Sequence, residues 1–302
     1  MITLNSEQGL IDIESWDDVI TRPGYVIELD PTKHALDSII GRYIEIDMVK
    51  CGLTNCHSPH SKGYFVKTKD GLSTNIGKDC GKKYFGVDFE TMAKKFEHDL
   101  IVRNNRARLA TFSFQLEEIE QALNSLRDGK KGADWIFKKS RPLVTTNTGC
   151  PNEIVRRLQS MIKASTSTLT KAREATSEEI TVLEISQGRS IQRPHVIEEP
   201  IGEISGLLAL HPENDIRNLL VLDIDTNLKA FSLLNIDNLD YKELAYRCSW
   251  FDALEDKLLK ATSIVKEGLE LLRHINLQPF SAILNDKNDK ALFKSYLQSL
   301  AN

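Results

Sequence analysis

Apolar and polar residues alternate over two short stretches near the N-terminus. "YVIELD" at 25–30 and "RYIEIDMV" at 42–49 follow this period of two, which is typical of half-buried β-strands. "GYFVKTKDGLSTNIG" at 63–77 contains two further apolar runs, one on each side of an Asp-Gly pair. Such a pair favours a two-residue type I′ turn in a β-hairpin. Residues 1–87 therefore predict a small α+β domain.

The period changes to three and four in the next segment. Apolar residues with this spacing continue to "RDGKKG", which predicts one helix over 88–126; they are Phe89, Met92, Phe96, Leu100, Leu109, Phe112, Leu116, Ile119, Leu123 and Leu126. A second apolar stripe predicts a helix over 153–185. Because two neighbouring helices can pack antiparallel, residues 88–186 are expected to form a long helical hairpin with coiled-coil character.

The segment after this hairpin is rich in proline and glycine, and we interpret residues 187–200 as a linker. Leucine-rich helical spacing then predicts a helical domain over 201–302. Within that domain, periodicity alone leaves open whether 215–235 is strand or helix. The predicted fold class is mainly α, with a small zinc-stapled α+β N-terminal part, a long helical hairpin and a C-terminal helical domain.

Composition agrees with a globular cytoplasmic protein. The 302 residues are 41% hydrophobic and 27% charged, which is enough apolar content for a real core. The sequence has no apolar run long enough to cross a membrane, and its N-terminus lacks the features of a signal peptide. Five cysteines are few for a disulfide scaffold, so reduced thiols and a cytoplasmic location are expected.

Three of the five cysteines lie close together in the sequence, with the spacing Cys51-x4-Cys56-x3-His60-x19-Cys80. Zn²⁺ binds thiolate and imidazole ligands tetrahedrally, and three cysteines with one histidine form a standard structural set. We predict a structural zinc ion held by these four residues. His57 is the alternative to His60, because both histidines follow the second cysteine closely.

The order of two knuckle cysteines, a predicted hairpin and a cysteine at a helix start resembles treble-clef-like zinc fingers, also described as zinc-knuckle modules. The resemblance covers residues 51–86, and the knuckle cysteines are here separated by four residues. It implies a zinc ion whose role is to hold the polypeptide in shape. The rest of the chain resembles no family.

The net charge of −4 is unevenly distributed. Residues 62–141 contain 17 lysines and arginines against 11 acids, so a basic middle region could contact phosphates. The candidate nucleic-acid contacts for DNA or RNA are Lys82, Lys83, Tyr84, Lys94, Lys95, Arg103, Arg106 and Arg108. The alternative is that these side chains form the solvated face of a long helix.

These features predict a zinc-stabilised binding or scaffold protein that engages nucleic acid or a protein partner, and no membrane. One alternative is a protein–protein regulator that uses the helical hairpin, which could also form a homo-oligomer. Another is a metal-dependent hydrolase with Asp70 or Asp79 as general base, or with Asp223 and Asp225 as a D-x-D element. No catalytic residue is identified, and binding is favoured over turnover.

Overall fold

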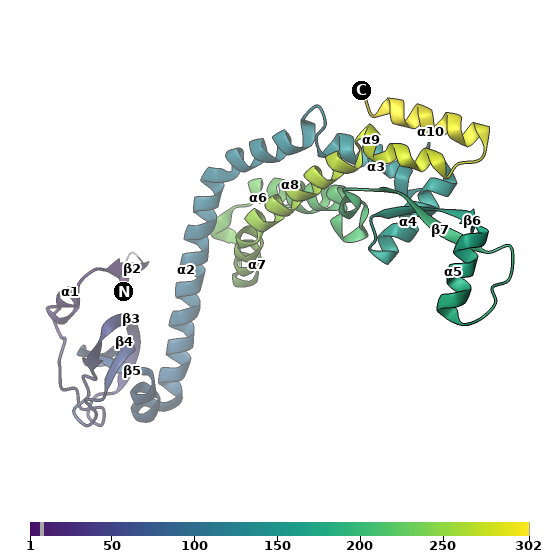
Figure 1. Cartoon of the computed structure of the whole chain (residues 1–302). Helices are drawn as coiled ribbons and strands as arrows, with labels where there is room; N and C mark the ends of the chain where they lie inside the picture. The colour runs from purple at the N-terminus through teal and green to yellow at the C-terminus, as the bar shows by residue number, and fades with distance from the viewer. Residues whose placement is uncertain (7–8, 302) are drawn as a thin grey trace. The chain divides into compact units, whose positions relative to one another are not determined.

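The structure is a computed structural model that describes residues 1–6 and 9–301 (Figure 1). The chain is 57% helical, with an antiparallel sheet near the N-terminus and long helices. This confirms the predicted fold class of an α protein with an α+β N-terminal part. Two compact units are present: Met1–Thr111 with Ile236–Cys248, and Phe112–Asn235 with Ser249–Asn302. We call them the first and the second unit.

A five-stranded antiparallel sheet with the order β2-β1-β3-β4-β5 forms the base of the first unit. A short helix, α1 (Asp17–Ile20), lies between β2 and β3 in the chain. The strands are β1 (Ile2–Ser6), β2 (Gly9–Ile13), β3 (Leu36–Lys50), β4 (Pro59–Thr68) and β5 (Ser73–Gly77). The alternating segment 42–49 lies within β3, as its period of two predicts. Segment 25–30 forms isolated bridges instead of a regular strand.

Successive side chains of β4 point to opposite faces of this sheet, and both faces are covered. Tyr64 and Val66 belong to a core cluster that includes Phe89 of helix α2, while Phe65 belongs to a second cluster with Tyr43 and Ile2. All five residues of β5 are buried. The continuous apolar run in β4 therefore reflects a strand that is buried on both sides.

The hairpin between β4 and β5 differs from the predicted type I′ turn. Gly71 alone among the loop residues has a positive φ, 90°, whereas a type I′ turn needs positive φ at two successive residues. The Gly71 amide donates to the Thr68 carbonyl oxygen at 2.9 Å, and the Thr68 amide donates to the Leu72 carbonyl oxygen at 2.8 Å. The loop is longer than two residues, so glycine is required at only one position.

Helix α2 (Lys78–Asp128) contains the predicted helix over 88–126, which is confirmed. Its regular backbone is interrupted at Gly86, with φ 62° and ψ −139°. A residue with a Cβ would be strained in this conformation, so glycine permits a short first segment to precede the long one. Figure 1 shows this short segment beside the edge of the sheet.

The second unit is mostly helical. Its helices are α3 (Ala133–Val144), α4 (Asn152–Ala164), α5 (Ser177–Gln187), α6 (Thr226–Ser232), α8 (Leu254–Leu271), α9 (His274–Leu277) and α10 (Lys287–Ser299). Helices α2 and α7 (Tyr241–Asp252) contribute to both units. Segment 215–235 is helical: a π-helix at Asn218–Asp225 leads into α6. Short 3₁₀ turns occupy Leu207–Leu210, Pro212–Asn214 and Gln278–Ala282, and a further one at Ile236–Asn238 belongs to the first unit. Over the residues described, no helix combines the length and apolarity needed to cross a bilayer.

The predicted second arm of the helical hairpin is wrong. Helix α4 ends at Ala164, and the next regular element is a strand, β6 (Thr168–Glu174), which pairs antiparallel with β7 (Val196–Glu203). Threonines in this stretch disfavour a helix and favour a strand, and Leu169 is fully buried. The predicted linker over 187–200 is also wrong, because its residues from Val196 onward belong to strand β7. Strand β7 continues to Glu203, inside the predicted helical domain.

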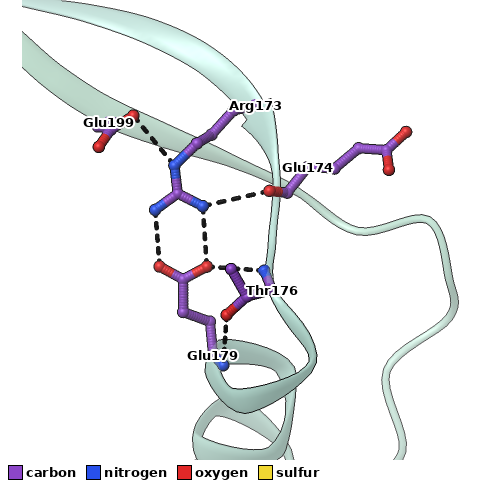
Figure 2. A network of polar contacts seen from close by, with 5 residues as sticks. All are labelled: Arg173, Glu174, Thr176, Glu179 and Glu199. Carbon is purple, nitrogen blue, oxygen red and sulfur yellow. Dashed lines mark hydrogen bonds and ion pairs between the residues drawn. The ribbon is translucent and has the colours of Figure 1, made fainter.

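Helix α5 begins directly after β6 because a polar network fixes the junction (Figure 2). The Arg173 guanidinium donates to both carboxylate oxygens of Glu179, at 2.8 and 2.7 Å, and to Glu199 at 3.0 Å. Thr176 and Glu179 form a reciprocal capping box. The bond from Arg173, with the backbone amide of Thr176, lowers the pKa of Glu179 to about 2. The network therefore joins both strands to the first turn of α5.

Candidate metal centre

Three thiols converge in the first unit. Cys51 follows the last residue of β3, Cys56 lies in the loop before β4, and Cys80 lies in the first turn of α2. Their sulfur atoms all lie within 4.8 Å of one another, and the Cys56 and Cys80 sulfurs are 3.0 Å apart. Cys51 is buried and the other two are partly exposed. This three-cysteine centre could hold a metal ion such as zinc.

Backbone hydrogen bonds fix the loop that carries the first two sulfurs. The Cys51 amide donates to the Ser58 carbonyl oxygen, and the Cys56 amide donates to the Leu53 carbonyl oxygen, each at 3.1 Å. The side chain of Leu53 is fully buried in the same core cluster as Phe89. The loop is therefore anchored on the sheet, and its two sulfurs face one point.

Packing of α2 fixes the third sulfur. A Cβ added at Gly81, the residue after Cys80, would overlap the ring of Phe89. Phe89 itself is fully buried and makes an edge-to-face contact with Tyr64, with ring centroids 5.6 Å apart. The short first segment of α2 therefore lies closely against the long one, and this contact sets the position of Cys80.

The thiols of the centre have unequal acidities in the metal-free protein. Burial raises the pKa of Cys51, and burial together with the neighbouring thiols raises the pKa of Cys80 to about 12. Burial also acts on Cys56, but hydrogen bonds from Cys80 and Ser58 outweigh it and lower the pKa of Cys56 to about 7. Three adjacent thiolates repel one another unless a cation neutralises them, and a divalent metal ion supplies that charge.

Neither predicted histidine ligand belongs to the group whose ligand atoms lie within 4.8 Å of one another. His60 Nδ1 lies 3.0 Å from the Ser58 carbonyl oxygen, and its Nε2 contacts the Tyr43 hydroxyl. Since a carbonyl oxygen only accepts, Nδ1 donates and Nε2 accepts from Tyr43. His57 is exposed and has a left-handed backbone, with φ 51°. The identity of a fourth ligand stays a prediction.

The predicted basic residues on and after the first turn of α2 divide into two groups. Lys82 pairs with Glu90 at 2.9 Å, Arg103 donates to both carboxylate oxygens of Asp12 at 3.0 Å, and Arg106 donates to a backbone carbonyl oxygen. Those three side chains have partners within the first unit. The side chains of Lys83, Lys94, Lys95 and Arg108 are exposed. Tyr84 is partly buried, with Lys83 over its ring at 5.1 Å and its hydroxyl donating to the Asn55 carbonyl oxygen.

The segment that carries the three cysteines is rich in lysine, and Lys50, Lys62 and Lys78 were not singled out by the sequence reasoning. Residues 50–83 contain seven lysines and two aspartates, and Lys50, Lys62 and Lys78 are exposed. One of the two acids, Asp70, pairs with His34 at 2.6 Å. A charge count confined to the cysteine-bearing segment reveals this excess of lysine, whereas the longer window of 62–141 combines it with the acids of the helix.

The two acids considered for catalysis as a D-x-D element have structural partners. Asp223 accepts from the Trp250 indole at 2.9 Å and pairs with Lys257 at 2.7 Å. Asp225 pairs with Lys229 at 2.8 Å. Both residues lie in the second unit, whereas the three-cysteine centre lies in the first. The D-x-D sequence therefore serves the packing of the π-helix.

Comparison of the chain with protein-family models, curated proteins and solved structures finds no match. The fold and the site define a mainly α protein whose α+β N-terminal part carries a three-cysteine group that could hold a metal ion. What the group does must follow from its geometry and surroundings.

Proposed function

We propose that this chain is a zinc-stabilised nucleic-acid-binding protein. The observation that carries the proposal is the convergence of three cysteine sulfurs within 4.8 Å, from two separate elements, inside a lysine-rich segment. Thiolates favour zinc among the common divalent ions, and a closed set of four ligands is typical of structural zinc. Zinc would fasten the loop before β4 to the start of α2.

A histidine that follows Cys56 closely in the sequence would complete the tetrahedral coordination of the zinc ion. His60 would have to give up its contacts with Tyr43 and Ser58, whereas His57 is exposed. We therefore propose His57 as the fourth ligand, with His60 as the residue that orients the loop. Substituting cobalt for zinc and comparing His57→Ala with His60→Ala tests this, because loss of the true ligand changes the cobalt absorption spectrum.

The lysines of the same segment support nucleic acid as the partner. Lysines neutralise phosphates and release counterions, and the affinity then depends steeply on salt. Lys50 and Lys62 are exposed on β3 and β4, and Lys78 and Lys83 are exposed on the first segment of α2. Zinc would hold these three elements together. Loss of the metal would therefore also change the positions of these lysines relative to one another, which links the zinc ion to binding.

Binding to a short fluorescent single strand is expected to weaken with added salt. If four or five phosphates are contacted, the logarithm of the association constant should fall with the logarithm of salt concentration with a slope of about −3. Replacing Lys50 and Lys62 by glutamine should make the slope shallower by about 1.4. Lys290→Gln, which changes an exposed lysine of the second unit, should leave it unchanged. Fluorescence anisotropy measures all three, and failure of both this single strand and its duplex to bind at about 50 mM salt would contradict the proposal.

Zinc uptake is expected to release protons and to tighten as pH rises. At pH 8 the raised pKa values of Cys51 and Cys80 keep both thiols protonated, while Cys56, with a pKa of about 7, is mostly ionised. Binding should then release about two protons, and the zinc affinity should rise about 100-fold for each pH unit near pH 8. Competition with a chromophoric chelator measures the affinity. An affinity that does not change with pH would exclude the thiols as ligands.

A further inference from the structure

A groove of about 570 Å³ lies within the first unit, and Lys78, Asp79 and Lys82, which flank Cys80 in the sequence, line part of it. One wall is the first segment of α2, with Lys78 and Lys82, and the other is the face of the long segment that carries Lys94. Phe89 and Tyr64 line its floor. The face from residue 90 to residue 101 is about 16 Å long at the rise of an α-helix, which suits a short run of an extended chain molecule.

Two of the three acids that line this groove are compensated within the protein, and the third, Asp79, is exposed in the first turn of α2. Glu90 pairs with Lys82 at 2.9 Å. Glu97 accepts from Arg42 at 2.8 Å and from the Tyr64 hydroxyl at 2.9 Å. Over the described residues, no ion pair involves Lys78 or Lys94. The groove therefore presents two ammonium groups that form no ion pair, against one exposed carboxylate, that of Asp79, above an apolar floor. With Arg42 paired to Glu97, the balance of charge is positive and favours an anionic ligand with flat or apolar parts.

One end of the groove carries stacked rings. The His98 and Tyr241 rings are stacked, with centroids 4.6 Å apart and planes inclined by 26°. Tyr241, the first residue of α7, is 39% exposed, so part of its ring is accessible to solvent. Aromatic faces beside unpaired lysines are typical of surfaces that bind single-stranded nucleic acid, because an unpaired base can stack while its phosphates are neutralised.

We propose that this groove binds single-stranded nucleic acid, with an unpaired base stacked on Tyr241 and phosphates at Lys78 and Lys94. This inference rests on the proposed function and adds the class of nucleic acid. A duplex keeps its bases paired, so it can offer phosphates to the surrounding lysines but no base to the groove. Single strands should therefore bind more tightly than the duplex of the same sequence.

The test compares aromatic variants on the same helix. Tyr241→Ala should weaken binding of a short single strand about tenfold, whereas Tyr241→Phe should retain most of the affinity because stacking needs only the ring. Tyr246→Ala is the matched control, since Tyr246 is an exposed tyrosine of α7 that does not line the groove. Duplex binding should change less than twofold in all three. Lys94→Gln should also make the salt slope for single strands shallower by about 0.7.

The outcomes separate the groove from the broader proposal. If Tyr241→Ala binds single strands as well as the unchanged protein does, while the Lys50 and Lys62 variant binds less well, the groove assignment is overturned and the proposed function stands. If no nucleic acid binds at low salt, or if only an acidic peptide such as poly-glutamate binds, both are overturned. Equal affinity for single strand and duplex also overturns the groove assignment. Circular dichroism verifies that each variant is folded.

Discussion

Cys80→Ser is expected to release the zinc ion and to loosen residues 51–86 while the second unit stays folded. Zinc binding to structural sites of this kind contributes about 10 kcal/mol or more to folding, and a serine hydroxyl is a poor ligand for zinc at neutral pH. Elemental analysis should find about one zinc ion per unchanged chain and almost none in the variant. Hydrogen exchange should show faster exchange across the loop before β4 and the first turn of α2.

Cys150→Ser is the matched control for this prediction. Cys150 is also a buried free thiol, 2% exposed, but it lies in the second unit. Its replacement should leave the zinc content unchanged, even if removal of a buried sulfur lowers stability. If both variants retained zinc, or if both lost it, the three-cysteine centre would not be the metal site.

Phe89→Ala is expected to lower the free energy of unfolding of the first unit by about 3 to 5 kcal/mol. The ring is fully buried, contacts Tyr64 and covers Gly81, so its removal leaves a cavity between α2 and the sheet. Because the same ring positions the turn that carries Cys80, zinc affinity should fall as well. Urea denaturation of the zinc-loaded protein measures the first effect, and competition with a chelator measures the second.

Val87→Ala provides the comparison for Phe89→Ala. Val87 lies two residues earlier in α2, but its side chain is 75% exposed. Its removal should change the free energy of unfolding by no more than about 0.5 kcal/mol. Equal effects of the two substitutions would mean that α2 does not pack on the sheet through Phe89.

Local patterns in the sequence were sufficient for two features. The apolar spacing of 88–126 predicted the long segment of α2, since a helical stripe depends only on neighbouring turns. The spacing of Cys51, Cys56 and Cys80 predicted the convergence of three thiols, since few arrangements explain clustered cysteines in a chain that otherwise has few. Each of these two patterns lies within a single continuous segment of the chain, so no distant residue is needed to recognise it.

Features that depend on distant partners were not predicted. Strand β6 looked like helix because its partner β7 begins more than twenty residues later, across α5. Arg103 looked like a free cation because Asp12 lies at the other end of the first unit's sequence. Likewise, the contact between Tyr43 and His60 depends on the pairing of β3 with β4. In each case the contact that determines the local structure joins residues that are far apart in the sequence. Hydrophobic periodicity carries no information about such contacts.

Zinc K-edge X-ray absorption of the purified full-length chain tests the central claim most directly. The account predicts one tetrahedral zinc ion with three sulfur neighbours at about 2.3 Å and one nitrogen neighbour at about 2.0 Å. A spectrum with only oxygen and nitrogen neighbours, or a protein that contains no zinc after growth and purification with zinc present, would contradict it.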